Sequence, residues 1–283
     1  MESKSHYNWH IENKSSPFDL KLKEVWRYRD LLSLLVKRDF ISFYKQTILG
    51  PLWFFIQPLL TTIIFTFVFG KFGGFSTDGL PKPLFFMAGI TAWNYFADCL
   101  IKTSSVFKDS AHIFGKVYFP RFIMPLSIVA SNLVKFFVQM VLLLLTLGYY
   151  IFIKKVNCFP NVYILLFPIL VLMMGLLGLG LGMIISSMTT KYRDLAFLVS
   201  FGVQLLMYAT TVVYPLSGLG SETAWIVKLN PMTAIIETFR FGLLGNASFS
   251  WELLGYSFVC SIGILIVGIF IFNKVEKTFV DTI

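Results

Sequence analysis

The sequence predicts an all-α membrane protein with six transmembrane helices, an N-terminal amphipathic helix at the membrane interface and short external helices before the last span. Of its 283 residues, 56% are hydrophobic and 14% are charged, with 31 phenylalanines and a mean hydropathy of +0.74. Average soluble domains carry about 25% charged residues. A soluble fold of this length buries only about three quarters of its surface, so the excess apolar surface must face lipid. The composition excludes a soluble enzyme, a disordered chain and a disulfide scaffold.

Residues 1–50 are expected to form a cytoplasmic N-terminal region, followed by a transmembrane domain over 51–283. An amphipathic helix is predicted over 17–47. Ser16, Pro17 and Asp19 provide a cap, a proline at the first helical position and an acid in the first turn. Apolar residues recur at helical spacing between basic ones, so this helix would lie on an anionic membrane surface. It serves either as a simple anchor or as a gate at a pore mouth.

Six apolar stretches follow, each close to the ~20 residues that a helix needs to cross the hydrocarbon core. The second is interrupted by Trp93, Asn94 and Asp98, so we expect it to be broken or partly exposed to a cavity. The predicted spans are residues 51–70, 83–101, 123–153, 161–188, 195–215 and 253–272.

Basic residues set the predicted orientation. An even number of spans puts both termini on one side of the membrane, and that side carries 17 lysines and arginines against six on the other. The positive-inside rule then places the termini and the 102–122 loop in the cytoplasm. The net charge of +9 is explained by this distribution, so we expect membrane lipids and no nucleic acid as partners.

The segment 215–250, between the fifth and sixth spans, is too polar to cross the membrane and too apolar for a free loop. Prolines and glycines interrupt its first part, and Asn230-Pro231 starts a second helix with an apolar face. Glu237 and Arg240 are three residues apart and are expected to pair. We predict short helices that lie on or dip into the outer leaflet.

The sequence shows no motif for nucleotide binding, metal binding or catalysis. It contains no P-loop, and the three cysteines and three histidines form no metal-ligand spacing. The glycines at 175, 178, 180 and 182 lie within a span, where Gly178 and Gly182 favour close helix packing over a dinucleotide fingerprint. We therefore expect no catalytic residue, no metal and no cofactor bound by this chain.

Lys135 is the one basic residue inside an apolar span. Asn132, Lys135 and Gln139 share one helix face, which predicts a polar stripe that faces the bundle. Lys135 either snorkels or pairs structurally, or it contacts an anionic substrate head group. Asp98 lies near the cytoplasmic end of the second span, and we expect it at the interface.

Five motifs, in order, carry a resemblance to a known family. The stretch RDFISFYKQTILGPLW at 38–53, with QPL at 57–59, resembles the start of the first span in polysaccharide-exporting ABC permeases of the type-2 class. The other motifs are GITAWNYF at 89–96, KVYFPR at 116–121, YRD at 192–194, and NPM at 230–232 with residues 237–245. The match runs over most of the chain from about residue 20. His112 departs from the asparagine expected in many members.

The resemblance implies the membrane half of an exporter that acts as a homodimer in the cell inner membrane. Two copies of a separate ATPase subunit would dock on it and hold the ATP and Mg²⁺. The cargo would be a lipid-linked polysaccharide such as O antigen, with capsule and teichoic-acid exporters as near relatives. The implied contacts with the ATPase are Lys116, Tyr118, Phe119, Pro120, Arg121, Tyr192, Arg193 and Asp194.

Aromatic residues are dense around the first two spans. Aromatic rings stack on sugars without trapping them, so a polymer would slide past them; packing against lipid is the alternative. The candidate residues of the translocation pathway are Trp53, Trp93, Tyr95, Phe96 and Lys135. Two other functions stay open: export of a drug or small lipid by the same architecture, and an integral enzyme.

Overall fold

A computed structural model describes residues 22–45, 47–110, 119–189, 192 and 194–280, and this part of the chain is helical with no strand. Five helical segments are long and apolar enough to cross a membrane: Gly50–Phe72, Lys82–Ser104, Ile123–Phe152, Val162–Thr189 and Trp251–Val275. A shorter apolar helix, Leu195–Tyr208, stands where the fifth of the six predicted spans lies. The all-helical membrane architecture is therefore confirmed.

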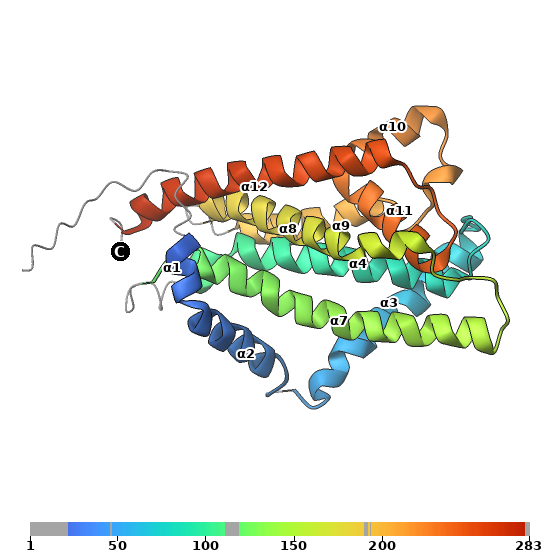
Figure 1. Ribbon diagram of the computed structural model, residues 1–283, viewed down its shortest axis with the longest axis horizontal. Coiled ribbons are helices and arrows are strands. Elements are labelled where there is room, and N and C mark those ends of the chain that lie inside the picture. The colour runs from blue at the N-terminus through green and yellow to red at the C-terminus, as the bar shows by residue number, and fades with distance from the viewer. Residues whose placement is uncertain (1–21, 46, 111–118, 190–191, 193, 281–283) are drawn as a thin grey trace, which may run out of the picture.

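The elements follow the chain in a simple order. The N-terminal helices are α1 (Leu22–Arg27) and α2 (Arg29–Lys45), and the bundle helices run along the long axis of the molecule (Figure 1). The elements after α2 are η1 (Gly50–Leu52), α3 (Trp53–Phe65), the π-helix η2 (Thr66–Phe72), α4 (Lys82–Ser104), α5 (Val106–Asp109), α7 (Ile123–Phe152), η3 (Val162–Leu166), α8 (Phe167–Thr189), α9 (Leu195–Tyr208), η4 (Leu216–Gly218), α10 (Ser221–Leu229), α11 (Pro231–Leu244) and α12 (Trp251–Val280).

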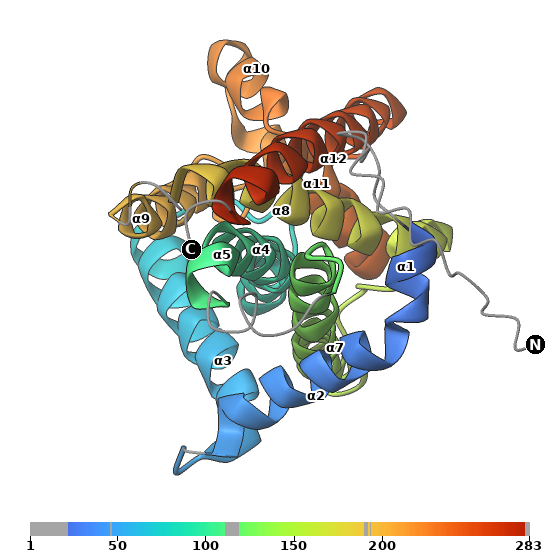
Figure 2. The same cartoon turned by 90° about the vertical axis from the view of Figure 1, so that its left-hand side faces the viewer.

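Helix α4 occupies the centre of the bundle. It packs against α3, α7, α8, α9 and α11, and the end-on view shows it surrounded by its neighbours (Figure 2). It is one unbroken helix of 23 residues, and most of its side chains are buried. The expectation that the second span is broken was wrong, whereas its partial exposure to a cavity stays a prediction. Trp93 is buried, and Asn94 and Asp98 are only partly exposed, because neighbouring helices cover most of their surface.

Glycines on α8 let it approach α4 closely. A Cβ atom on Gly178 would lie 2.7 Å from Cys99 Cβ, and one on Gly182 would lie 2.5 Å from Thr103 Cβ. Without a hydrophobic drive between helices in lipid, such close packing is a main source of association. The predicted role of Gly178 and Gly182 in helix packing is confirmed.

One end of the bundle gathers the N-terminal helices and the last turns of α12. Phe107 stacks on Phe272 with ring centroids 4.6 Å apart, and Leu35 of α2 belongs to the same buried cluster. Thr189 Oγ1 donates a hydrogen bond of 2.5 Å to the carbonyl of Ser104, which brings the ends of α8 and α4 together here. The connections after α4 and α8 therefore start at the end that carries α2. This agrees with the count of spans, because the chain returns to its starting side after the second and the fourth crossing.

The predicted fifth span of 195–215 is shorter than expected. Helix α9 has 14 residues, about 21 Å, and ends at Tyr208. The next residues form turns in which Thr210 and Val212 are fully buried. Irregular backbone of this kind is tolerated at membrane depth only where protein buries it.

The two helices before the last span differ in burial. Helix α11 is largely buried and packs against α4, α8 and α12, so it enters the bundle. Helix α10 projects from the bundle (Figure 2) and exposes Trp225, Ile226 and Leu229. Short helices before the last span are thus confirmed, one inserted between other helices and one on the surface.

We expect Gly182→Ala to lower the free energy of unfolding by about 1–3 kcal/mol, because the new methyl group forces α8 away from α4. Gly148→Ala is the matched control, since a Cβ there meets no atom within 4 Å. Thermal unfolding of the purified variants measures both. Equal midpoints for the two variants would contradict the close approach of α4 and α8.

Candidate functional site

An ion pair joins the central helix α4 to α7. Lys135 Nζ lies 2.6 Å from Asp98 Oδ2, and the two side chains are 13% and 27% exposed. Lys135 thus makes the structural pairing that the sequence left as one of its alternatives. Asp98 is held in this pair because α7 brings an opposite charge within reach, and its expected place at the interface stays a prediction.

The pair belongs to a longer polar seam between α4 and α7. Lys102 Nζ donates to Asn132 Oδ1 over 3.0 Å, and Asn132 Nδ2 lies 3.9 Å from Cys99 Sγ. On the other side of Lys135, Gln139 is buried and its Nε2 has no hydrogen-bond partner among the described residues. The prediction that Asn132, Lys135 and Gln139 form a stripe facing the bundle is confirmed. Contact of Lys135 with an anionic head group stays a prediction.

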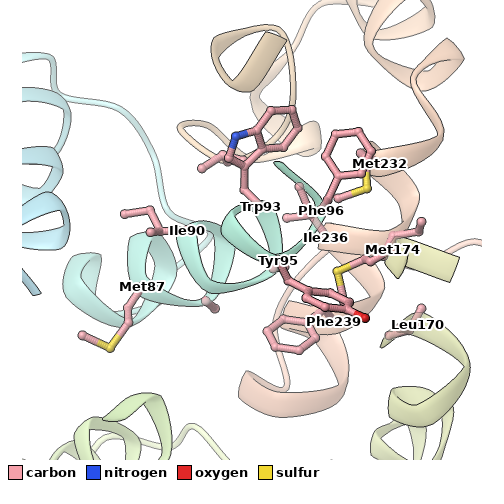
Figure 3. Close-up of a cluster of buried hydrophobic side chains, with 14 of the residues drawn as sticks. Met87, Ile90, Trp93, Tyr95, Phe96, Leu170, Met174, Met232, Ile236 and Phe239 are labelled. Atoms are coloured by element: carbon pink, nitrogen blue, oxygen red, sulfur yellow. The ribbon is translucent and has the colours of Figure 1, made fainter. Parts of the chain in front are cut away.

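The aromatic residues of α4 lie in the core of the chain. Trp93, Tyr95 and Phe96 are at most 4% exposed and pack among side chains of α8 and α11 (Figure 3). Tyr95 contacts Phe136 of α7 with ring centroids 5.2 Å apart. Trp53, at the start of α3, keeps 40% of its surface exposed. The three aromatics of α4 thus pack inside the protein, and their part in a translocation pathway stays a prediction.

A second charged centre surrounds Arg240, which is fully buried on α11. Its guanidinium donates to the carbonyls of Phe85 (3.2 Å), Thr211 and Val212 (2.8 Å). Its Nη1 also lies 3.4 Å from Glu237 Oε1, so the predicted pair is confirmed.

These contacts explain how the chain can turn after α9. The turn leaves buried carbonyl groups without helical partners, and an unpaired buried carbonyl costs about 1–3 kcal/mol. Arg240 supplies the donors for Thr211 and Val212. A side chain at Gly89 of α4 would overlap the guanidinium, which accounts for glycine there. The sequence predicts Arg240 on a short external helix, because spacing along one helix indicates its pairing with Glu237 but not its distant carbonyl partners.

Glu237 is fixed from two sides. Its Oε1 faces Arg240, and its Oε2 accepts a hydrogen bond of 3.2 Å from the backbone N–H of Ser248. Burial raises the pKa of the Glu237 carboxyl, while the Arg240 guanidinium and the Ser248 N–H oppose that rise. Glu237 thereby links α11 to the segment that precedes α12.

Five of the eight predicted contacts with an ATPase lie in the described part of the chain, at the end of the bundle that carries α2. Lys116, Tyr118 and Arg193 lie outside the described residues. Phe119 is buried in a cluster with Leu35 and Met124, and Pro120 and Arg121 are half-buried. Tyr192 and Asp194 are exposed. The described part of the chain also contains no group of three or more His, Cys, Asp or Glu residues placed to hold a metal ion.

We expect Asp98→Asn and Lys135→Gln each to lower the free energy of unfolding by on the order of 2 kcal/mol, below the cost for a fully buried pair because both side chains keep some exposure. The double variant should cost less than the two single effects added together. Thermal unfolding of the four proteins measures this coupling. Asp30→Asn, at the exposed pair with Arg29, is the control and should change the free energy of unfolding little. Strictly additive effects of the two neutral substitutions would show that the pair is not coupled.

Comparison with known proteins agrees with this architecture. A family model described as ABC-2 type transporter matches residues 30–244. The O-antigen export system permease protein RfbA of Myxococcus xanthus is 30% identical over 222 residues, which cover 77% of this chain and 82% of that protein. A protein of the same name from Klebsiella pneumoniae is 27% identical over 93% of this chain and 98% of its own length. The capsule polysaccharide export inner-membrane protein CtrC of Neisseria meningitidis serogroup A is 20% identical over 90% of this chain and 95% of its own length.

The family match spans most of the chain, from within α2 to the end of α11, and therefore includes both the α4–α7 seam and the Arg240 centre. The chain belongs to the ABC-2 type transporter family of membrane permeases.

Proposed function

We propose that this chain is the membrane-spanning subunit of an ATP-driven exporter, which moves a lipid-linked polysaccharide of the O-antigen kind from the cytoplasmic side across the inner membrane. The observation that carries the proposal is similarity to O-antigen export permeases from two organisms, over most of both chains. The helices that are long and apolar enough to cross a membrane are consistent with a membrane-spanning subunit.

Energy must come from another subunit under this proposal. The sequence has no P-loop to bind nucleotide phosphates. A homodimer of the chain would bind two copies of an ATPase subunit, which hold ATP and Mg²⁺. The docking surface would be the end of the bundle that carries α2, where Arg121, Tyr192 and Asp194 retain exposed surface. The excess of lysine and arginine on this side supports a cytoplasmic location for it and for both termini.

The polymer path would involve the predicted residues in two different ways. Trp53 and the Asp98–Lys135 pair keep part of their surface exposed. Trp93, Tyr95 and Phe96 are buried, so a polymer reaches them only when α4 separates from its neighbours. Movement of α4 within the dimer during ATP hydrolysis would supply that separation.

Capsular polysaccharide is the second candidate cargo, and the similarity to CtrC favours it. That relative shares a lower identity over a similar length than the O-antigen permeases do. O antigen therefore remains the preferred cargo.

Deletion of the gene in the producing cell tests the proposal. We expect O antigen to disappear from the cell surface and its lipid-linked form to accumulate inside, with recovery when the gene is supplied in trans. Immunoblots of intact and lysed cells separate the two pools. Loss of capsule with O antigen unchanged would select the second candidate. Unchanged surface polysaccharides of both kinds would contradict the function.

Docking of the ATPase provides a separate prediction. We expect Tyr192→Ala and Arg121→Ala to weaken co-purification of the ATPase several-fold while leaving the thermal midpoint of the permease close to wild type. Phe119→Ala should instead lower that midpoint, because a buried Phe→Ala change costs about 3–5 kcal/mol. Trp225→Ala, on α10, is the control for an exposed aromatic residue away from this end. ATPase capture at wild-type strength by both surface variants would remove Tyr192 and Arg121 from the docking surface.

A further inference from the structure

A cavity of about 570 Å³ lies between α10, α11 and the start of α12. Its volume is within the ~300–1,000 Å³ range of small-molecule sites. It is far from the proposed ATPase end: about 32 Å of helix separates Trp251 from Phe272, whose ring packs at that end. Figure 1 shows α10 and α11 at the opposite end from α1. We call it the α10–α12 pocket, and the residues that define it here are Ser217, Lys228, Glu237, Ser248, Phe249 and Glu252.

Hydrogen-bond acceptors line the pocket in fixed positions. Glu237 is held by Arg240 and by the Ser248 N–H, and a carboxylate has about four lone-pair sites, so it can accept further bonds. Ser217 Oγ donates to Asp78 Oδ1 over 2.5 Å, which orients its hydroxyl oxygen. Glu252 is exposed in the first turn of α12 and adds a second carboxylate near the solvent.

Aromatic and aliphatic side chains form an apolar part of the pocket wall. Phe249 stacks on Phe241 with centroids 5.5 Å apart and an angle of 10° between the rings. Trp251 meets Phe249 edge-on at 5.0 Å. Neighbouring leucine and alanine side chains complete the wall. Such a wall suits the C–H face of a sugar ring, while the carboxylates and serines suit its hydroxyl groups.

The charges at the pocket do not favour an anion. Glu237 is paired with Arg240, so their two charges offset each other. The other charged groups among the described lining residues are one carboxylate on Glu252 and one ammonium group on Lys228. A diphosphate would therefore meet no net positive charge in the pocket, whereas a neutral ligand rich in hydroxyl donors needs none.

We propose that the α10–α12 pocket binds a short neutral segment of the exported saccharide as it leaves the membrane. This inference rests on the proposed function, because the pocket chemistry indicates a hydroxyl-rich ligand and the export of polysaccharide supplies one. A saccharide held at this end, away from the ATPase, would be hindered from sliding back between strokes.

The test uses the full-length permease in lipid nanodiscs. The probe is a set of neutral oligosaccharides cut by mild acid from the polymer that accumulates in the deletion strain, and calorimetric titration measures its binding. We expect Ala224→Phe, which fills the pocket from α10, to abolish binding, and Glu252→Gln to weaken it about tenfold through loss of a charged acceptor. The matched controls are Ile226→Phe and Glu222→Gln, at exposed positions on α10 that do not line the pocket; both should bind as wild type does.

Three results would overturn the pocket proposal. They are no binding by the wild-type chain, binding that survives in Ala224→Phe, and displacement of the oligosaccharides by sodium pyrophosphate, which would indicate an anion site. Each variant is first checked for a wild-type thermal midpoint, and Glu252→Gln lies at an exposed position. If deletion of the gene blocks export but the pocket variants bind normally, only the pocket proposal fails. If deletion blocks no export, the proposed function itself fails.

Discussion

The buried guanidinium of Arg240 is the contact on which the arrangement of this bundle depends. A lone buried cation costs several kcal/mol, so it is stable only when charge and carbonyl partners surround it. Here one carboxylate and three carbonyl groups do so, and they come from α4, from the turn after α9 and from α11 itself. The same contacts allow the chain to reverse inside the bundle. Arg240 therefore connects the central helix α4 to the turn after α9.

The central position of α4 explains how its polar residues are accommodated. A helix at the surface of a membrane bundle would present Asp98 to lipid, where a charge is costly. In the centre, α7 provides Lys135 as the partner of Asp98, and α8 approaches α4 closely through glycines. Close packing and paired charges hold α4 in one position. Any motion of α4 during transport must break the ion pair or separate the glycine contact.

The two ends of the bundle differ in chemistry as well as in position. One end gathers α2, the last turns of α12 and the residues proposed to contact an ATPase, and the sequence is rich in lysine and arginine there. The other end carries α10, α11 and a pocket lined by serines, two carboxylates and one lysine. A protein that receives energy on one side and releases a neutral polymer on the other would show such a division. The buried Glu237–Arg240 pair lies between the pocket and α4, so it connects the pocket to the core.

The sequence by itself determined the helical membrane class and the close packing at Gly178 and Gly182, because hydropathy and helical spacing are local properties. It also indicated the stripe of Asn132, Lys135 and Gln139 and the pairing of Glu237 with Arg240, since residues three or four apart share a helix face. Only the tertiary structure decided that α4 is central, that Lys135 pairs with Asp98, that α9 ends at Tyr208 and that Phe119 is buried. Each of these depends on atoms from segments far apart in the chain. Hydropathy records that a residue avoids water, but it does not distinguish burial in lipid from burial in protein.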